Sequence, residues 1–125
     1  MRYVILEHDH PQRHWDFMLE VGDVLRTWRL ASPPQLGGTV SAEASFDHRP
    51  FYLDYEGPVS GDRGTVVRWD AGTFTRLEEA EDRVVVRLQG RRLDGEAVLS
   101  RKAAGDWVFS IAEAGSAVNS PRSSC

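Results

Sequence analysis

Nine short segments of the chain alternate between apolar and polar residues or are rich in β-branched and aromatic residues. A period of two is typical of β-strands that are buried on one face. Pairs of turn-forming residues separate the segments, among them Gly22-Asp23, Ala71-Gly72 and Asp94-Gly95, at the spacing of an antiparallel meander. The pattern predicts strands at residues 3–6, 15–19, 24–30, 39–46, 65–69, 73–77, 84–88, 97–99 and 107–111.

This succession of short strands predicts an all-β fold. We expect a small closed or nearly closed antiparallel β-barrel, because closure removes the exposed edges of a short open sheet. Only residues 77–83 could form a helix, and they are few and acidic, so any helix or turn should be short and peripheral. Residues 1–114 are expected to form one barrel domain. Residues 115–125 are small, polar and without periodicity, which predicts a disordered tail.

Composition narrows the classes of function. A chain of 125 residues fits one domain and excludes a separate cofactor-binding domain within it. With 15 Lys and Arg against 19 Asp and Glu, the formal charge is −4, so any nucleic-acid binding must rest on a local site. The single cysteine, Cys125, excludes a disulfide or a cysteine zinc site within the chain. Without a signal peptide or a membrane-spanning stretch, we expect a cytoplasmic protein with no membrane partner.

A group of histidines near the N-terminus could carry chemistry. Alternation places His14, Asp16 and Met18 on one face of the strand at residues 15–19, opposite three apolar side chains that mark the buried face. His8, at the end of the first strand, could supply a third ligand. Two imidazoles and one carboxylate suit Mn²⁺, Zn²⁺ or Fe²⁺ and leave coordination positions for water and substrate. The alternative is that these side chains are ordinary polar surface residues.

The order of these residues is similar to that of a known family. His8-Asp9, four residues, and then HWDFMLE at residues 14–20 resemble the HDxxxxHYDFRLE signature of the 3′-phosphoesterase domain of bacterial DNA ligase D. Four further motifs match in register: residues 24–28 resemble LKSW, 47–57 resemble DHPLDYADFEG, 64–74 resemble GTVIIWDRGTW and 87–95 resemble RLxGxKLxG. The similarity extends from about residue 3 to residue 111.

The resemblance implies a compact β-barrel with a divalent metal at one mouth, usually Mn²⁺, with Zn²⁺ or another ion as an alternative. Members of the family remove a terminal ribonucleotide and then a 3′-phosphate from broken DNA, leaving a 3′-hydroxyl. By position, the metal ligands are His8, His14 and Asp16, and the active-site histidine and tyrosine are His48 and Tyr52. His48 would stabilise or protonate the phosphoryl group and Tyr52 would hydrogen-bond it. A strand through both would put them on one face.

The chain departs from the family at its phosphate contacts. Met18 stands where the signature has an arginine, and a second phosphate-site arginine falls on Val40. An apolar thioether cannot replace the paired donors of a guanidinium. Arg13, Arg49 and Arg63 lie close to the motifs in sequence and are candidates to bind phosphate from another direction.

The sequence therefore suggests a metal-dependent hydrolase that acts on nucleic-acid 3′ ends in end repair, with a ligase or polymerase as a partner in trans. Two alternatives stay open. A catalytically degenerate homologue would keep the metal and bind nucleic acid or a protein without turnover. A non-haem iron oxygenase would use His14, Asp16 and His48 as ligands and leave His8 outside the coordination sphere.

Overall fold

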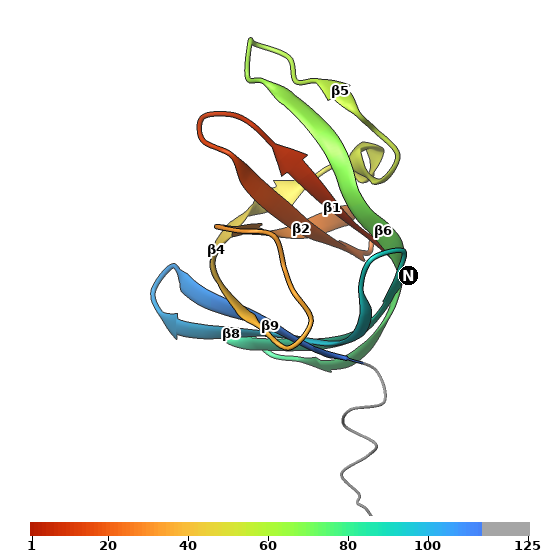
Figure 1. Ribbon diagram of the computed structural model, residues 1–125, viewed down its shortest axis with the longest axis vertical. Helices are drawn as coiled ribbons and strands as arrows, with labels where there is room; N and C mark the ends of the chain where they lie inside the picture. Colours follow the sequence, from red (N-terminus) through yellow and green to blue (C-terminus); the bar gives the residue numbers. More distant parts are fainter. Residues whose placement is uncertain (114–125) are drawn as a thin grey trace, which may run out of the picture.

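The computed structural model describes residues 1–113, which are almost entirely β-structure (Figure 1). One short 3₁₀ helix, η1, interrupts the strands. The elements in chain order are β1 (Arg2–His8), β2 (His14–Val21), β3 (Val24–Leu30), β4 (Thr39–His48), η1 (Pro50–Leu53), β5 (Gly57–Pro58), β6 (Thr65–Glu79), β7 (Arg83–Gly90), β8 (Asp94–Ala103) and β9 (Asp106–Glu113).

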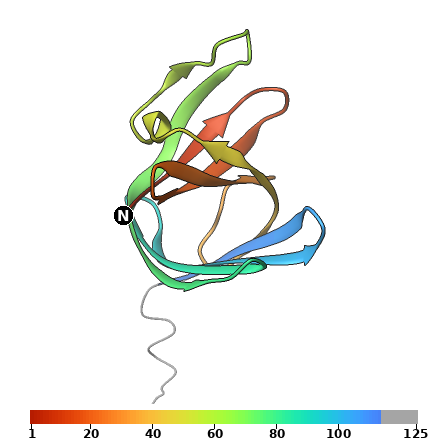
Figure 2. The ribbon, with the colours of Figure 1, turned by 180° about the vertical axis from the view of Figure 1, so that it is seen from behind.

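Eight of the strands close into an antiparallel barrel. Their order around the ring is β1-β2-β3-β4-β9-β8-β7-β6, and β6 pairs back with β1. The remaining strand, β5, is an outer strand that pairs only with the first residues of β6. Figures 1 and 2 show the ring from its two sides, with β1 and β2 in one half of the wall and β8 and β9 in the other. The prediction of an all-β closed barrel is confirmed.

The long strand β6 links the two halves of the barrel. Its early residues pair with β1 and β5, and its later residues pair with β7. The turn predicted at Ala71-Gly72 is therefore wrong, because both residues lie in the middle of this strand. Gly72 is needed for close packing of strands: a Cβ atom there would collide with the carbonyl oxygen of Gln89 on β7.

Two other local predictions are also corrected. Residues 77–83 form no helix, because they belong to the tight hairpin between β6 and β7, where Arg83 lies 3.3 Å from Glu78. Asp94 opens β8 and does not form a turn. The reversal before it lies at residues 91–93 and is closed by a 2.7 Å hydrogen bond from the amide of Gly90 to the carbonyl of Leu93.

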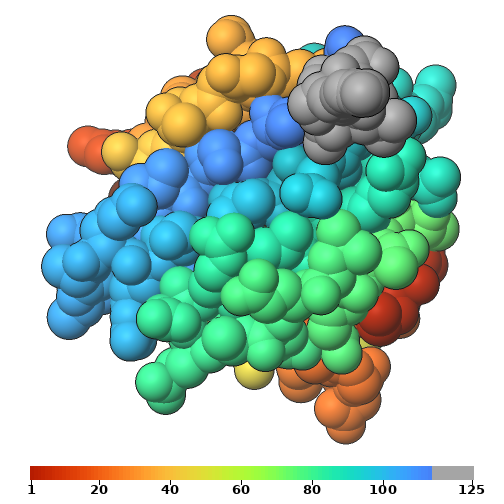
Figure 3. All heavy atoms as spheres, turned by 90° about the horizontal axis from the view of Figure 1, so that it is seen from below, coloured from red at the N-terminus to blue at the C-terminus, as the bar shows by residue number. Residues whose placement is uncertain are grey.

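The main hydrophobic cluster fills the barrel. Aromatic side chains from opposite parts of the wall meet there: Phe17 and Phe109 have ring centroids 5.2 Å apart, and Trp28 and Trp107 have centroids 5.6 Å apart. Both pairs meet edge to face, a geometry worth about 0.5–1.5 kcal/mol beyond the buried area. These contacts join β2 and β3 to β9 across the interior. Figure 3 shows the outer surface of the opposite wall, where β6 to β9 lie side by side in sequence order.

A second, smaller cluster lies on the other face of β1–β3. Val4 and Leu6 of β1, Met18 of β2 and Leu25 of β3 pack there under Leu53 of η1. The connection between β4 and β6 therefore covers the outer face of these strands. We expected this face of β2 to be the open one, but non-local packing buries it.

Residues 115–125, predicted to be a disordered tail, lie outside the described residues. Among residues 1–113, no helix is long and apolar enough to cross a membrane.

Candidate active site

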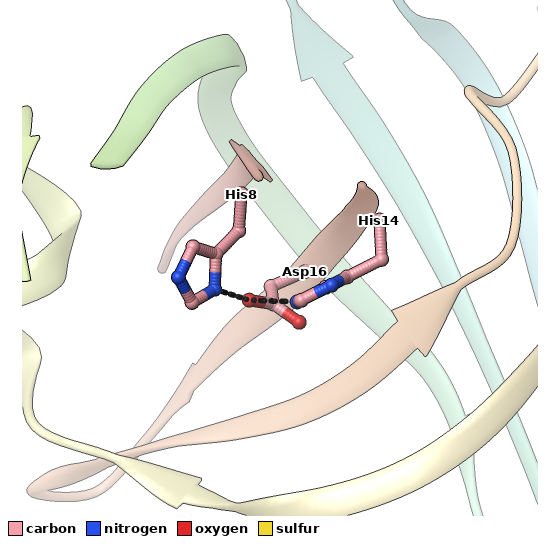
Figure 4. A group of neighbouring side chains, drawn as sticks. All are labelled: His8, His14 and Asp16. Carbon is pink, nitrogen blue, oxygen red and sulfur yellow. Dashed lines mark hydrogen bonds and ion pairs between the residues drawn. The ribbon is translucent and has the colours of Figure 1, made fainter. Parts of the chain in front are cut away.

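His8, His14 and Asp16 converge at the end of the hairpin formed by β1 and β2 (Figure 4). His8 and His14 are direct cross-strand partners, and Asp16 follows on the same face of β2. Oδ2 of Asp16 lies 3.2 Å from Nε2 of His14 and 3.8 Å from Nδ1 of His8. The side chains lie at the barrel end, on the face of the wall that points away from the main cluster.

Backbone carbonyls orient both imidazole rings. Nε2 of His8 donates to the carbonyl oxygen of Arg63, and Nδ1 of His14 donates to that of Gln12, each over 2.8 Å. A carbonyl oxygen only accepts, so these two nitrogens carry the protons. The nitrogens that face Asp16 therefore bear a lone pair when the rings are neutral, and they donate to the carboxylate when the rings are protonated. This is the second-sphere arrangement that typically orients histidine ligands to a metal.

The carboxyl group of Asp16 is held in its charged form. Burial opposes the charge, but the hydrogen bond with His14 and the nearby imidazole of His8 outweigh it and lower the pKa of Asp16 to about 2. The carboxylate of Asp16, 3.8 Å from Nδ1 of His8, in turn raises the pKa of His8. Asp16 is only 4% exposed, so the site concentrates one negative charge in a nearly dry environment.

This donor set fits a divalent cation. The three ligand atoms all lie within 4.8 Å of one another. Nitrogen and oxygen ligands about 2.1 Å from one ion are about 3.0–3.4 Å apart in octahedral or tetrahedral geometry. The separation of Asp16 and His14 already meets this value, and Nδ1 of His8, 3.8 Å from Asp16, has to move closer to complete the set. The chemistry suits Mn²⁺ or Zn²⁺.

A cavity of about 470 Å³ opens beside the group. His8 and Asp16 form one part of its lining, and η1 and the connections on either side of it form another. Four of the other residues predicted for the site also line the cavity, namely His48, Arg49, Tyr52 and Arg63. The apolar side chain of Met18 and one additional arginine, Arg29, line it as well. The structure thus brings together most of the predicted site.

His48 and Tyr52 meet through a helix and not through a strand. His48 ends β4, whereas Tyr52 lies in η1, so the expected strand geometry is wrong. The two rings nevertheless meet edge to face with centroids 5.7 Å apart, because η1 folds the chain back over the end of β4.

The ring of His48 is also fixed by its neighbours. Nδ1 lies 3.0 Å from the carbonyl oxygen of Phe46 and 3.0 Å from Oγ1 of Thr27, which itself donates to the carbonyl of Leu25. Nδ1 therefore carries the proton, and Nε2 keeps a lone pair in the neutral ring. Burial lowers the pKa of His48, so the neutral form prevails at neutral pH.

The predicted arginines differ in position. Arg49 lies over the rings of Phe51 and Tyr52 at the cavity. Arg63 lines the cavity, and its Nε donates to the carbonyl of Ser60 over 2.7 Å. Arg13 pairs with Glu7 and lines a neighbouring hollow.

Met18 and Val40, the two positions that depart from the family signature, lie in different parts of the fold. Met18 is 1% exposed and lines the cavity on the same strand face as Asp16, as the alternation predicts. Val40 packs in the main cluster inside the barrel, so its side chain contributes nothing to the cavity.

Sequence reasoning missed Arg29. It is the direct cross-strand partner of Asp16, and it lines both the cavity and the neighbouring hollow. Its Nε is buried and has no hydrogen-bond partner among the described residues. Alternation in the segment 24–30 contained the signal, because Trp28 and Leu30 face the core and Arg29 must therefore face away from it.

Comparison with known proteins is consistent with this geometry. The family model of the DNA ligase D 3′-phosphoesterase domain matches residues 6–101. The multifunctional non-homologous end joining protein LigD of Pseudomonas aeruginosa is 31% identical over 112 residues, which cover 86% of this chain and 13% of that protein. The multifunctional non-homologous end joining DNA repair protein LigD of Mycobacterium tuberculosis is 34% identical over 117 residues, which cover 85% of this chain and 15% of that protein.

The chain thus spans about one seventh of the length of these relatives. The matched region includes His8, His14 and Asp16 and extends through most of the barrel. This chain belongs to the DNA ligase D 3′-phosphoesterase domain family.

Proposed function

We propose that the chain is a metal-dependent 3′-phosphoesterase that removes a ribonucleotide or a phosphate from the 3′ ends of broken DNA. The observation that carries the proposal is the convergence of His8 and His14 on Asp16, with both rings oriented by backbone carbonyls, at the edge of a cavity lined by arginines. Membership of the family and the end-joining relatives supports DNA ends as the substrate class.

The proposed ligands of the metal are His8 Nδ1, His14 Nε2 and one carboxylate oxygen of Asp16. A divalent ion held there would neutralise charge on a phosphate oxygen and lower the pKa of water. We favour Mn²⁺ because imidazole and carboxylate ligands leave positions for oxygen ligands from substrate and solvent; Zn²⁺ fits the same donors.

His48 is proposed to act as a proton acceptor, through the lone pair on Nε2. In the removal of a 3′-phosphate, His48 takes a proton from the water that adds to phosphorus. It returns that proton to the 3′ oxygen as the bond from phosphorus to that oxygen breaks, which leaves inorganic phosphate and a 3′-hydroxyl. The lowered pKa of His48 favours this role over the protonation of phosphate by a resting imidazolium. Tyr52, at the edge of the His48 ring, is proposed to hydrogen-bond the phosphoryl oxygens.

Arg29 is proposed to take over part of the phosphate contact that Met18 cannot make. Its unpartnered Nε lies on the strand next to Asp16. A charge-assisted hydrogen bond from a guanidinium to phosphate is about twice as strong as a neutral one. Arg49 and Arg63 line the same cavity and are proposed to contribute charge.

The test is an assay with Mn²⁺ and primer-templates that end in a 3′-phosphate or a 3′-ribonucleotide. The wild-type chain should produce 3′-hydroxyl ends, and His14→Ala should produce none. Asp23→Asn, in the exposed turn between β2 and β3, is the matched control and should leave the rate unchanged. Wild-type product no higher than that of His14→Ala would overturn the proposal.

A homologue without turnover is the second candidate, and the apolar Met18 in the cavity favours it. In that case the same DNA ends would bind in the presence of Mn²⁺ without product. The iron oxygenase arrangement receives no support, because His8 joins His14 and Asp16 in the close group and His48 does not.

A further inference from the structure

A row of aromatic side chains begins at the cavity and continues over the surface beside it. Phe46 stacks on His48, with centroids 4.6 Å apart and ring planes inclined by 13°. His48 meets Tyr52, and Tyr52 meets Phe51 with centroids 5.3 Å apart. The row thus leads from the proposed catalytic histidine to η1.

The two phenylalanines at the outer positions of this row are open to solvent. Phe46 is 71% exposed and Phe51 is 53% exposed. Single exposed apolar residues are common, but here Phe46 lines the cavity and Phe51 is joined to it through the rings of His48 and Tyr52. The guanidinium of Arg49 lies 5.4 Å from the centre of the Phe51 ring, which adds a cation to this surface.

An unpaired nucleobase has the chemistry that matches this surface. Its flat faces stack on aromatic rings whatever the base, and Arg adds a cation–π contribution. Within a duplex those faces are covered by neighbouring bases. The chain also carries a formal charge of −4, so it lacks the bulk positive charge that holds duplex DNA, and stacking supplies affinity that does not depend on charge.

We propose that Phe46, Phe51 and Arg49 form a stacking platform for the base of an unpaired 3′-terminal nucleotide. The preferred substrate class is then a single-stranded or frayed 3′ end. This inference rests on the proposed function, which places the 3′ phosphate in the adjoining cavity. The base would lie on the platform while the phosphate reaches the group formed by His8, His14 and Asp16.

The experiment measures equilibrium binding of oligonucleotides that end in a 3′-hydroxyl, so that no turnover is needed. Three ends are compared by fluorescence anisotropy: a single strand, the same strand with an abasic 3′-terminal nucleotide, and the same strand paired in a blunt duplex. The single strand with its terminal base should bind about 5- to 150-fold more tightly than the abasic strand, the range found for stacking on aromatic side chains. The blunt duplex should bind more weakly than the single strand.

Variants assign that preference to the platform. Phe46→Ala should bring the affinities of the base-bearing and abasic strands close together, and Phe46→Trp should restore the difference. Leu77→Ala is the matched control, because Leu77 is 51% exposed on β6 and lines none of the cavities described above. Phe46 is exposed, so thermal unfolding should be unchanged and the loss will not reflect misfolding.

Equal affinity of the wild-type chain for base-bearing and abasic strands would overturn the inference. A preference that survives in the Phe46→Ala, Phe51→Ala double variant would also overturn it. Neither result depends on phosphoesterase turnover. A chain that binds the base as described but forms no product would contradict the proposed function alone.

Discussion

Asp16 on β2 and Arg29 on β3 face each other across the antiparallel ladder, and both line the same cavity. The carboxylate belongs to the proposed metal group, and the guanidinium keeps a buried Nε without a hydrogen-bond partner among the described residues. One strand pair thus presents the carboxylate proposed to bind a metal next to the guanidinium proposed to bind phosphate. A phosphate lying between them would contact an ion held by the carboxylate and would accept a hydrogen bond from the guanidinium.

Arg29→Gln should weaken phosphate binding about 10-fold or more, because a hydrogen bond to a charged group contributes about 1.5–3 kcal/mol. The KM for a 3′-phosphate oligonucleotide, or the inhibition constant of inorganic phosphate, measures the effect. Arg87→Gln, on the exposed side of β7, is the control. If both variants bind phosphate as the wild-type chain does, Arg29 has no phosphate role.

Met18→Arg would restore the residue that the family signature has at this position. Since Met18 is 1% exposed, the new guanidinium would be almost dry, and a bound anion should relieve the cost of burying it. Inorganic phosphate should therefore raise the melting temperature of Met18→Arg more than that of the wild-type chain. Turnover, where present, should rise.

Met18→Leu serves as the comparison, because this swap conserves volume and costs less than about 1.5 kcal/mol. It should show no additional response to phosphate. A folded Met18→Arg variant that binds metal but responds to phosphate like Met18→Leu would mean that position 18 does not face the phosphate.

Mn²⁺ should stabilise the chain against unfolding. At an ion concentration 100 times the dissociation constant, the gain is about 2.7 kcal/mol, because the ion binds the folded state only. His8→Ala, His14→Ala and Asp16→Asn should each lose most of that gain in thermal unfolding, and a chelator should abolish it in the wild-type chain. His48→Ala should retain it. Loss in His48→Ala with retention in His8→Ala would favour the iron-type ligand set instead.

Strand periodicity predicted most of the fold because each strand of a closed barrel has one face in the core. The turn predicted at Ala71-Gly72 was wrong because Gly72 lies within β6, where it allows β6 and β7 to approach closely. Its neighbours in the sequence resemble those of a turn. Residues 77–83, the one helical candidate, form a hairpin, because charge and shortness do not separate a helix from a hairpin and pairing with β7 decided the outcome.

The convergence of His8, His14 and Asp16 could be predicted because the three residues lie in one hairpin, where register and alternation are local. The cover over that group could not, because it comes from η1 and the adjoining chain more than thirty residues away. For the same reason, the sequence pointed to His48 and Tyr52 through a resemblance but misplaced Tyr52 on a strand. Arg29 was accessible from alternation alone and was missed because it lies in no motif that carries chemistry.

A buried carboxylate on β6 anchors the junction between β1 and β6. Asp70 is 2% exposed and accepts hydrogen bonds from the hydroxyl of Tyr3 over 2.7 Å and from the amides of Arg91, Arg92 and Leu93. It therefore ties β1 and β6 to the turn between β7 and β8. Burial, and then the hydrogen bond to Asp70, raise the pKa of the Tyr3 hydroxyl far above its ordinary value of 10.0.

This shift predicts a loss of stability in alkaline solution. Tyr3 stays protonated in the folded chain, whereas in the unfolded chain it ionises near its ordinary pKa of 10.0. Its contribution is complete below that pH and is lost as the pH rises further, by about 1.4 kcal/mol per pH unit. Between about pH 8 and about pH 11, the wild-type chain should therefore lose about 1.4 kcal/mol more of its unfolding free energy in urea than Tyr3→Phe does.

Tyr3→Phe should also be less stable than the wild-type chain at about pH 8, by about 1–3 kcal/mol, because one acceptor position of a buried carboxylate loses its donor. Tyr55→Phe is the control, since Tyr55 lies outside the main cluster and far along the chain from this network. It should keep the alkaline loss seen in the wild-type chain. An identical alkaline loss in all three proteins would show that Tyr3 does not carry the linkage, and the bond between Tyr3 and Asp70 would then contribute little to holding β1 against β6.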